Sequence, residues 1–213
     1  MDAGPRIDRY IWAGGREPML RFGPDDGPVA VLALPLFEEA NRTRAFGASI
    51  LRALAARGIG GVLPELPGQG ESAVATNAAK LCDLRAALET APGTHVLAIR
   101  SGALVCDDRP CWLFAPQSGA ELIRELTRVN GGALEGDEID IAGNMLTRSL
   151  VGDLATARHR EDARVVRLSS DPRGADMHVD GPALWRRAEP DNDIQLAERL
   201  AADIAEWMAA CAG

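Results

Sequence analysis

Continuous apolar runs and amphipathic stretches alternate along most of the chain. The continuous runs are typical of strands that are covered on both faces, and they occupy residues 29–34, 61–63, 96–99 and 111–115. Residues 165–168, which include Arg167, predict a further strand. Between them, apolar residues recur at helical spacing, over residues 46–54, 81–88, 122–129, 150–157 and 194–208. This alternation predicts an α/β fold in which a mostly parallel central sheet is flanked by helices.

Local signals add three elements to this pattern. Residues 9–13 and 18–22 predict a β-hairpin that turns at Gly14 and Gly15. Ser118, followed three residues later by Glu121, has the form of a capping box and predicts the start of a helix. Residues 177–179 predict a last short strand.

Composition indicates one globular domain that covers residues 1–213. Hydrophobic residues make up 46% and charged residues 25% of the chain, which is ordinary for a globular protein. The formal net charge is −8 and no basic stretch is present, so we expect no nucleic-acid partner. The longest apolar run, residues 29–37, is too short to span a bilayer, and the N-terminus has no apolar core. We therefore expect a cytoplasmic protein without a membrane span.

The cysteines and histidines do not predict a metal site. The four cysteines have no C-x-x-C spacing, and no histidine stands at ligand spacing from any of them. We expect the cysteines to be buried and reduced, and we expect no cofactor.

The loop after the second apolar run is rich in glycine. Residues 65–72 read Glu-Leu-Pro-Gly-Gln-Gly-Glu-Ser. This segment resembles the Asp-x-x-Gly-x-Gly-x-Ser loop of α/β-hydrolases, with Glu65 in place of the usual aspartate. The glycines permit positive φ angles where the chain folds back, so we expect the motif to shape the loop first and to take part in chemistry only secondarily.

Further segments extend this resemblance over most of the chain from about residue 29 onward. They are residues 35–44, residues 113–116 leading to Gly119, residues 138–143 and residues 181–185. Together they are similar to the hydrolases associated with the exosortase A system. The resemblance implies a single-domain α/β-hydrolase-like fold and a setting beside exopolysaccharide and protein-sorting machinery, and it implies no particular substrate.

The turn after the third apolar run is where such a fold carries its nucleophile. The pattern is small-x-nucleophile-x-small, and with Ala98 and Gly102 as the small residues the central position is Arg100. A protonated guanidinium cannot attack a carbonyl. A shift by one residue makes Ser101 the nucleophile, but it puts bulky Ile99 in the first small position, so the sequence favours Arg100.

The remaining triad candidates are Asp171 and His178, which follow Ser101 in the order found in α/β-hydrolases. Only six residues separate the two, whereas a parallel crossover takes about a dozen or more. We therefore expect the strands beside them to pair as a hairpin or to splay apart, and we expect His178 to lie within the last strand. These positions predict a degenerate triad.

Arg100 has two interpretations. The segment from Ser101 to Pro110 leaves room for roughly two helical turns of ~3.6 residues, and a helix N-terminus beside Arg100 could hold an anion. The alternative is that Arg100 pairs internally with Glu38 or Glu39, because a buried arginine is seldom left unpaired.

Ligands of parallel sheets bind at the carboxyl ends of the strands. The residues expected to contact a ligand there are Leu36, Phe37, Glu38, Gln69, Arg100, Pro116 and Gln117. Residues 117–162 lie where α/β-hydrolases insert a cap over the cleft. Their leucine-rich helices either cover an apolar pocket or pack on the sheet.

Three functions remain open on the sequence alone. The first is a catalytically reduced protein that binds a small ligand or a protein partner in an exosortase-linked or exopolysaccharide-linked process. The second is a working serine esterase or acyl hydrolase that uses Ser101, Asp171 and His178, with backbone N–H groups near Phe37 and Gly102 stabilising the oxyanion. The third is a structural role in a complex, which predicts a large exposed apolar patch and no deep pocket.

Overall fold

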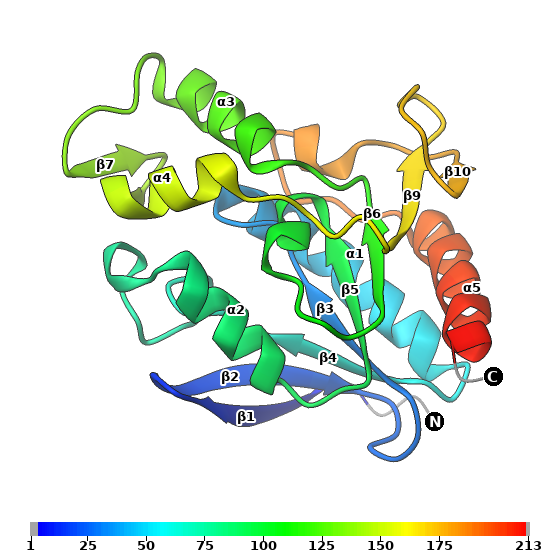
Figure 1. The fold of residues 1–213 in the computed structure, drawn as a ribbon. Coiled ribbons are helices and arrows are strands. Elements are labelled where there is room, and N and C mark those ends of the chain that lie inside the picture. The colour runs from blue at the N-terminus through cyan, green and yellow to red at the C-terminus, as the bar shows by residue number, and fades with distance from the viewer. Residues whose placement is uncertain (1–3, 212–213) are drawn as a thin grey trace.

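A computed structural model describes residues 4–211 and contains an eight-stranded sheet (Figure 1). Its strands, in spatial order, are β1 (Arg6–Trp12), β2 (Gly15–Phe22), β4 (Gly60–Pro64), β3 (Val29–Ala33), β5 (His95–Ile99), β6 (Cys111–Phe114), β9 (Arg164–Leu168) and β10 (Met177–Val179). The strands from β4 to β10 run parallel, and the hairpin β1–β2 adds two antiparallel strands at one edge. The predicted fold class and the predicted hairpin are confirmed.

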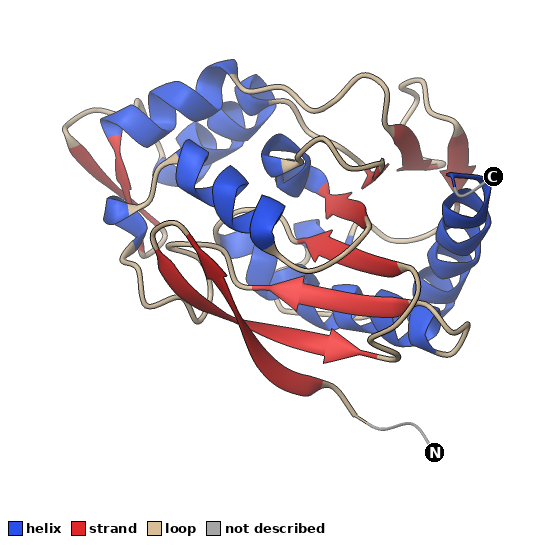
Figure 2. Ribbon diagram, turned by 60° about the horizontal axis from the view of Figure 1, so that its bottom comes forward, coloured by secondary structure: helices blue, strands red, loops and turns tan. Residues whose placement is uncertain are grey.

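Helices cover both faces of this sheet, as Figure 2 shows. The long helices α1 (Glu38–Ala55) and α5 (Ile194–Cys211) pack together on one face. Helix α2 (Leu81–Thr90) and the short 3-10 helix η2 (Arg100–Val105) lie on the other. Within β3, Val31 packs on the α2 side and Leu32 on the α1 side, so every residue of the strand is buried. Burial on both faces explains the continuous apolar runs in the sequence.

A segment inserted between β6 and β9 forms the cap. It comprises α3 (Gly119–Asn130), a separate hairpin of β7 (Glu138–Ile141) and β8 (Asn144–Thr147), and α4 (Arg148–Thr156). Helix α3 begins with the predicted capping box, because the Ser118 side chain accepts from the Glu121 N–H and the Glu121 carboxylate accepts from the Ser118 N–H. The two helices of this segment were predicted, whereas the hairpin was not.

The β7–β8 hairpin turns through residues that give little turn signal. Ala142 and Gly143 both have positive φ, 51° and 83°, as a tight hairpin turn requires. Such positions are usually occupied by asparagine, aspartate or glycine. Because alanine is not typical of such a turn, the sequence did not predict it. Ile141 of β7 and Leu146 of β8 are both buried.

The expectation that the last two strands pair as a hairpin or splay apart is wrong. Strands β9 and β10 are parallel neighbours, with Met177 opposite Val166. Residues 169–176 return along the sheet edge without a helix. Asp176 closes this loop, because its N–H donates to the Val165 carbonyl and its carboxylate accepts from the Val165 N–H, at 2.8 and 2.7 Å. One backbone and one side-chain hydrogen bond of Asp176 thus hold the end of this short connection beside β9.

Within residues 4–211, none of the helices has the length and apolar content that crossing a bilayer requires.

The cysteines are only partly as expected. Cys111 is buried and Cys106 is partly buried beside it, with the two Sγ atoms 3.1 Å apart, but Cys82 and Cys211 are exposed on helices α2 and α5. Contact with the Cys111 thiol, together with burial, raises the pKa of the Cys106 thiol well above its ordinary value.

We therefore expect a short treatment with iodoacetamide to alkylate Cys82 and Cys211 and to spare Cys106 and Cys111, because the thiolate is the reactive form. Peptide mass spectrometry of the native protein checks this, with urea-unfolded protein as the control in which all four react. Equal labelling of all four cysteines in the native protein would contradict the packing around Cys106.

Candidate functional site

The turn from β5 into η2 is formed by Arg100. Strand β5 ends at Ile99, and the backbone of Arg100 has a φ of 54°. This left-handed conformation is rare for residues other than glycine. The nucleophile of an α/β-hydrolase occupies a strained strand-to-helix turn of this kind. Arg100 therefore has the backbone geometry of that position.

Packing around the turn fits the same register. A Cβ atom on Gly102 would lie 2.5 Å from the carbonyl oxygens of both Ala33 and Leu34, at the end of β3. Ala98, two residues before Arg100, is fully buried between the neighbouring strands. The small residues thus stand where close backbone approach requires them, two positions on either side of Arg100.

The Arg100 side chain is buried and paired. Only 7% of it is exposed. Its guanidinium donates to Glu39 on α1 at 3.2 Å and to Glu125 on α3 at 2.9 Å, and it lies 4.9 Å from the centre of the Trp185 ring. The internal pairing with Glu39 is therefore present, whereas Glu38 lies 3.9 Å from the Arg42 guanidinium instead.

Glu125 is a partner that the sequence analysis missed. It lies three residues after Leu122, on the side of α3 that faces the domain, and a carboxylate there requires a positive partner. The capping box fixes where this helix begins, so the sequence indicates the face that carries Glu125 but not the partner of its carboxylate. Burial raises the pKa of the Glu39 carboxyl, although Arg100 acts to lower it.

The structure does not bring Ser101, Asp171 and His178 together. Ser101 is fully buried, and its Oγ accepts from the Leu36 N–H at 2.9 Å. His178 is exposed on β10, with its Nε2 3.1 Å from the carbonyl oxygens of Asp171 and Arg173. Within residues 4–211, no hydrogen bond joins the side chains of these three candidates.

Asp171 is held by two arginines. Its carboxylate accepts hydrogen bonds from Arg173 at 2.7 Å and from Arg167 at 3.1 Å. The hydrogen bonds from Arg173 hold the pKa of the Asp171 carboxyl well below its usual range. This carboxylate therefore fixes the loop between β9 and β10.

Backbone N–H groups near the turn also donate to side chains of the protein. The Phe37 N–H, at the position expected to stabilise an oxyanion, donates to Gln69 Oε1 at 2.8 Å. Gln69 belongs to the glycine-rich loop, in which Gly68 and Gly70 have positive φ. The loop is tied down further because the Tyr10 hydroxyl donates to the Glu65 carbonyl at 2.6 Å. These hydrogen bonds hold the loop against β1 and the loop that follows β3.

A cavity of about 540 Å³ lies between the cap and the loop that follows β3. Its apolar wall comes mainly from Leu36, Phe37, Leu122, Leu126, Val129 and Leu146. The predicted contact residues Leu36, Phe37 and Glu38 line it, and so does Trp185 of the 3-10 helix η3 (Leu184–Arg186). Leu150 and Leu154 of the cap instead pack in the core on the α2 side. The leucines of α3 thus line the cavity, whereas those of α4 pack in the core among α2, α3 and β8.

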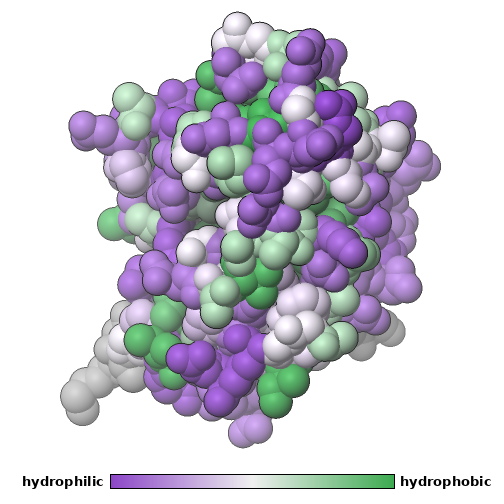
Figure 3. All heavy atoms as spheres, turned by 90° about the vertical axis from the view of Figure 1, so that its left-hand side faces the viewer, coloured by the Kyte–Doolittle hydropathy of each residue, from purple (hydrophilic) through white to green (hydrophobic). Residues whose placement is uncertain are grey.

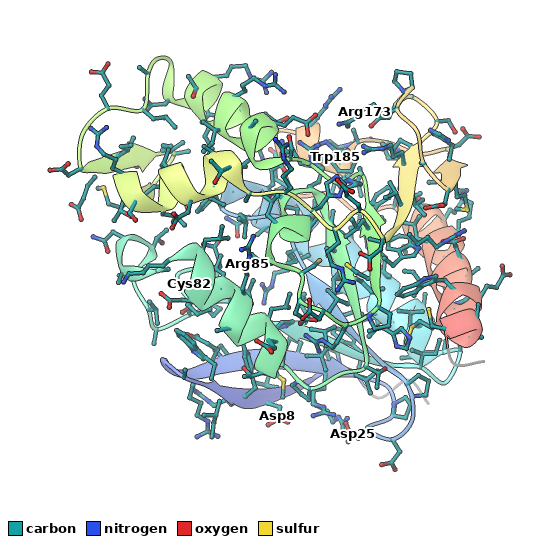
Figure 4. All side chains as sticks on the ribbon, in the orientation of Figure 1. Asp8, Asp25, Cys82, Arg85, Arg173 and Trp185 are labelled. Carbon is teal, nitrogen blue, oxygen red and sulfur yellow. The ribbon has the colours of Figure 1, made fainter. Side chains whose placement is uncertain are left out.

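A second hollow, of about 340 Å³, adjoins the cavity and is lined by arginines. Arg100 and Gln117 line it, together with Arg128 and Arg186, which also line the cavity. The Gln117 amide donates to Glu125 at 2.7 Å, while its buried Oε1 has no partner among residues 4–211. Figure 4 shows Arg173, another lining residue, near Trp185 at the same edge of the sheet.

The other expected contacts lie outside the cavity. The Pro116 carbonyl accepts from Arg167 at 3.4 Å, and Gln69 lines a small hollow beside the glycine-rich loop. Among residues 4–211, no group of three or more histidine, cysteine or acidic side chains could hold a metal ion.

Three solved structures share this architecture over nearly their whole length. Est1E of Butyrivibrio proteoclasticus with bound ferulic acid is 12% identical, with a TM-score of 0.61, and the match covers 95% of this chain and 99% of Est1E. A protein of Agrobacterium vitis S4 named as a hydrolase is 14% identical, with a TM-score of 0.59 and coverages of 95% and 97%. The bottromycin epimerase BotH in complex with bottromycin A2 is 16% identical, with a TM-score of 0.57 and coverages of 92% and 98%. Neither a protein-family model nor a curated protein sequence matches the chain. Identities this low establish the fold alone, and the fold of this protein is that of the α/β-hydrolases.

Proposed function

We propose that this protein is an α/β-hydrolase-fold protein with a degenerate catalytic triad, and that it binds a small ligand in the cavity beneath its cap. The observation that carries the proposal is Arg100 at the β5–η2 turn, with its guanidinium held between Glu39 and Glu125. An arginine stays protonated and cannot act as a nucleophile. Ser101, its neighbour, is buried and already accepts a hydrogen bond from the backbone.

The cavity supports the binding half of the proposal. Its volume of about 540 Å³ falls within the ~300–1,000 Å³ of typical ligand sites, and an apolar wall with a few polar groups is their usual composition. Two proteins of similar fold, Est1E and BotH, are solved with small organic molecules bound, and BotH is named an epimerase. This fold therefore occurs in proteins whose named activity is not hydrolysis.

The surface on the cap-hairpin side does not favour a purely structural role. Figure 3 views the side on which the cap hairpin lies, where hydrophobic residues form small groups separated by hydrophilic ones. A continuous apolar patch would favour a structural surface in a complex. The setting that we propose, a cytoplasmic process linked to exosortase or exopolysaccharide, rests on the sequence segments that resemble the exosortase-associated hydrolases.

Ester hydrolysis tests the first half of the proposal. We expect the native protein, Ser101→Ala and His178→Ala to hydrolyse p-nitrophenyl butyrate at the same background rate. A native rate above background that both substitutions abolish would establish the alternative, a serine esterase using Ser101, Asp171 and His178.

Binding of the neutral dye Nile red tests the second half. Leu126→Trp places a larger side chain into the cavity, so we expect it to weaken dye binding about tenfold or more, because a filled cavity loses the contact area that drives binding. The matched control is Ile194→Trp, at a position 66% exposed at the start of α5, and should leave binding unchanged. Equal dye binding by the native protein and Leu126→Trp would contradict a ligand site in this cavity.

A further inference from the structure

We infer that the ligand of this cavity is an amphipathic oxyanion, an apolar chain or ring that carries a carboxylate or phosphate group. This inference rests on the proposed function, because it names the class of ligand for the same cavity. The cavity would hold the apolar part, and the arginine-lined hollow beside it would hold the charged head.

The two hollows share part of their lining. Glu125, Arg128 and Arg186 line both the apolar cavity and the arginine-lined hollow. A ligand that fills the cavity therefore ends beside the two arginines. Arg128 comes from α3 and Arg186 from η3, so the head would lie between the cap and the main domain.

The charge around these hollows is opposite in sign to that of the whole chain. The formal net charge of the protein is −8, yet six arginines and four glutamates line the two hollows. A locally positive site in an acidic protein favours anions over cations.

The glutamates at the site already have partners. Glu39 and Glu125 share the Arg100 guanidinium, and Glu121 accepts from Arg173 at 2.8 Å. These three carboxylates thus engage Arg100 and Arg173, and the fourth, Glu38, lies 3.9 Å from the Arg42 guanidinium. Arg128 and Arg186 are therefore available to an incoming anion.

Several donors at the site have no acceptor within residues 4–211. Arg128 and Arg186 are exposed and have no side-chain hydrogen bond or ion pair there. The buried Nε of Arg42 and the buried indole N–H of Trp185 also have no hydrogen-bond acceptor, although Arg42 Nε lies 3.9 Å from the Glu38 carboxylate, and both residues line the cavity. Trp185 is only 6% exposed. Buried donors without acceptors are rare in folded proteins. Neither residue lines the arginine-lined hollow, so these two donors indicate a polar atom on the part of the ligand inside the cavity, in addition to the charged head.

Isothermal titration calorimetry with four decyl compounds tests the inference. The compounds are decanoate, decyl phosphate, decanol and decyltrimethylammonium, which share the chain and differ in the head. The variant is Arg128→Gln/Arg186→Gln, and its matched control is Arg9→Gln/Arg16→Gln, which removes the same charge from exposed positions on the β1–β2 hairpin.

We expect at least one of the two anions to bind the native protein about tenfold or more tightly than decanol, since a hydrogen bond to a charged group contributes about one factor of ten or more. The Arg128→Gln/Arg186→Gln variant should reduce that affinity to the level of decanol, while the control binds like the native protein. Preference between decanoate and decyl phosphate identifies the head group.

Decyltrimethylammonium binding as tightly as the anions, or anion binding unchanged in Arg128→Gln/Arg186→Gln, would overturn the inference. In either case, persistent binding of decanol and Nile red leaves the proposed function standing. If Nile red and all four decyl compounds fail to bind, the proposed function fails together with the inference.

Discussion

Replacing Arg100 with methionine is expected to lower the free energy of unfolding by about 3 kcal/mol, the lower end of the range for breaking a buried ion pair. The substitution leaves the carboxylates of Glu39 and Glu125 without their shared partner. Glu39 has 19% of its side chain exposed and Glu125 has 33%, so water compensates the loss only in part. Urea denaturation followed by circular dichroism measures the change.

Two further variants identify the cause of that loss. Arg124→Met removes an exposed arginine from the same helix as Glu125, and we expect a change within about 0.5 kcal/mol. Arg100→Met combined with Glu39→Gln and Glu125→Gln removes the unpaired charges and should recover most of the lost stability. An Arg100→Met protein as stable as the native one would show that the guanidinium is not held between these carboxylates.

The pH dependence of Arg100→Met has a defined sign. Burial already raises the pKa of the Glu39 carboxyl in the native protein. For an acid whose folded-state pKa is raised, the charged form costs stability, and this cost disappears as the pH falls through the folded-state value. Without Arg100 the pKa of Glu39 should rise further, so the variant should be less destabilised in mildly acidic buffer than at neutral pH. Denaturation at both pH values checks this.

Gly102→Ala is expected to be the second strongly destabilising substitution, by about 3 kcal/mol, the upper end of the usual range for overpacking. The added Cβ would lie 2.5 Å from two backbone carbonyl oxygens at the end of β3. Those oxygens belong to a central strand of the sheet, which cannot shift without disturbing its neighbours on both sides. The free energy of unfolding from urea titration is again the measurement.

Gly152 provides the matched control for Gly102. It lies inside helix α4, where a Cβ would meet no atom within 4 Å. Gly152→Ala should therefore stabilise the protein by about 0.5–1 kcal/mol, because glycine is a poor helix former. Equal effects of the two substitutions would contradict the close contact of η2 with β3, and with it the register that puts Arg100 at the turn.

Most of the sheet could be predicted because its signal is local. A strand buried on both faces is largely apolar, as β3 is throughout and β5 is from Val96 onward. The β7–β8 hairpin and the parallel β9–β10 pair lacked such a signal. The β7–β8 turn has Ala142 in a left-handed conformation, and alanine gives no turn signal in the sequence. The β9–β10 pair depends on hydrogen bonds between Asp176 and Val165, which are not a local pattern.

Apart from Gln117 at the start of the cap, the predicted part of the site lies on the main-domain side. Leu36, Phe37 and Glu38 follow a recognisable strand, so their place at the sheet edge was predictable. The cap contributes Glu125 and Arg128, and η3 contributes Trp185 and Arg186. Their contacts depend on the position of the cap relative to the sheet. No local sequence pattern determines that position. The Arg100–Glu125 pair required the phase of α3 and its tertiary position together.

Fluorophosphonate labelling tests most directly whether the nucleophile position is lost. Ser101 is fully buried and its Oγ accepts from the Leu36 N–H, so we predict that intact-mass and peptide spectra show no adduct on Ser101 after incubation with the probe. An adduct on Ser101 that forms in the native protein and is absent from Ser101→Ala would contradict the account and make the protein a serine hydrolase.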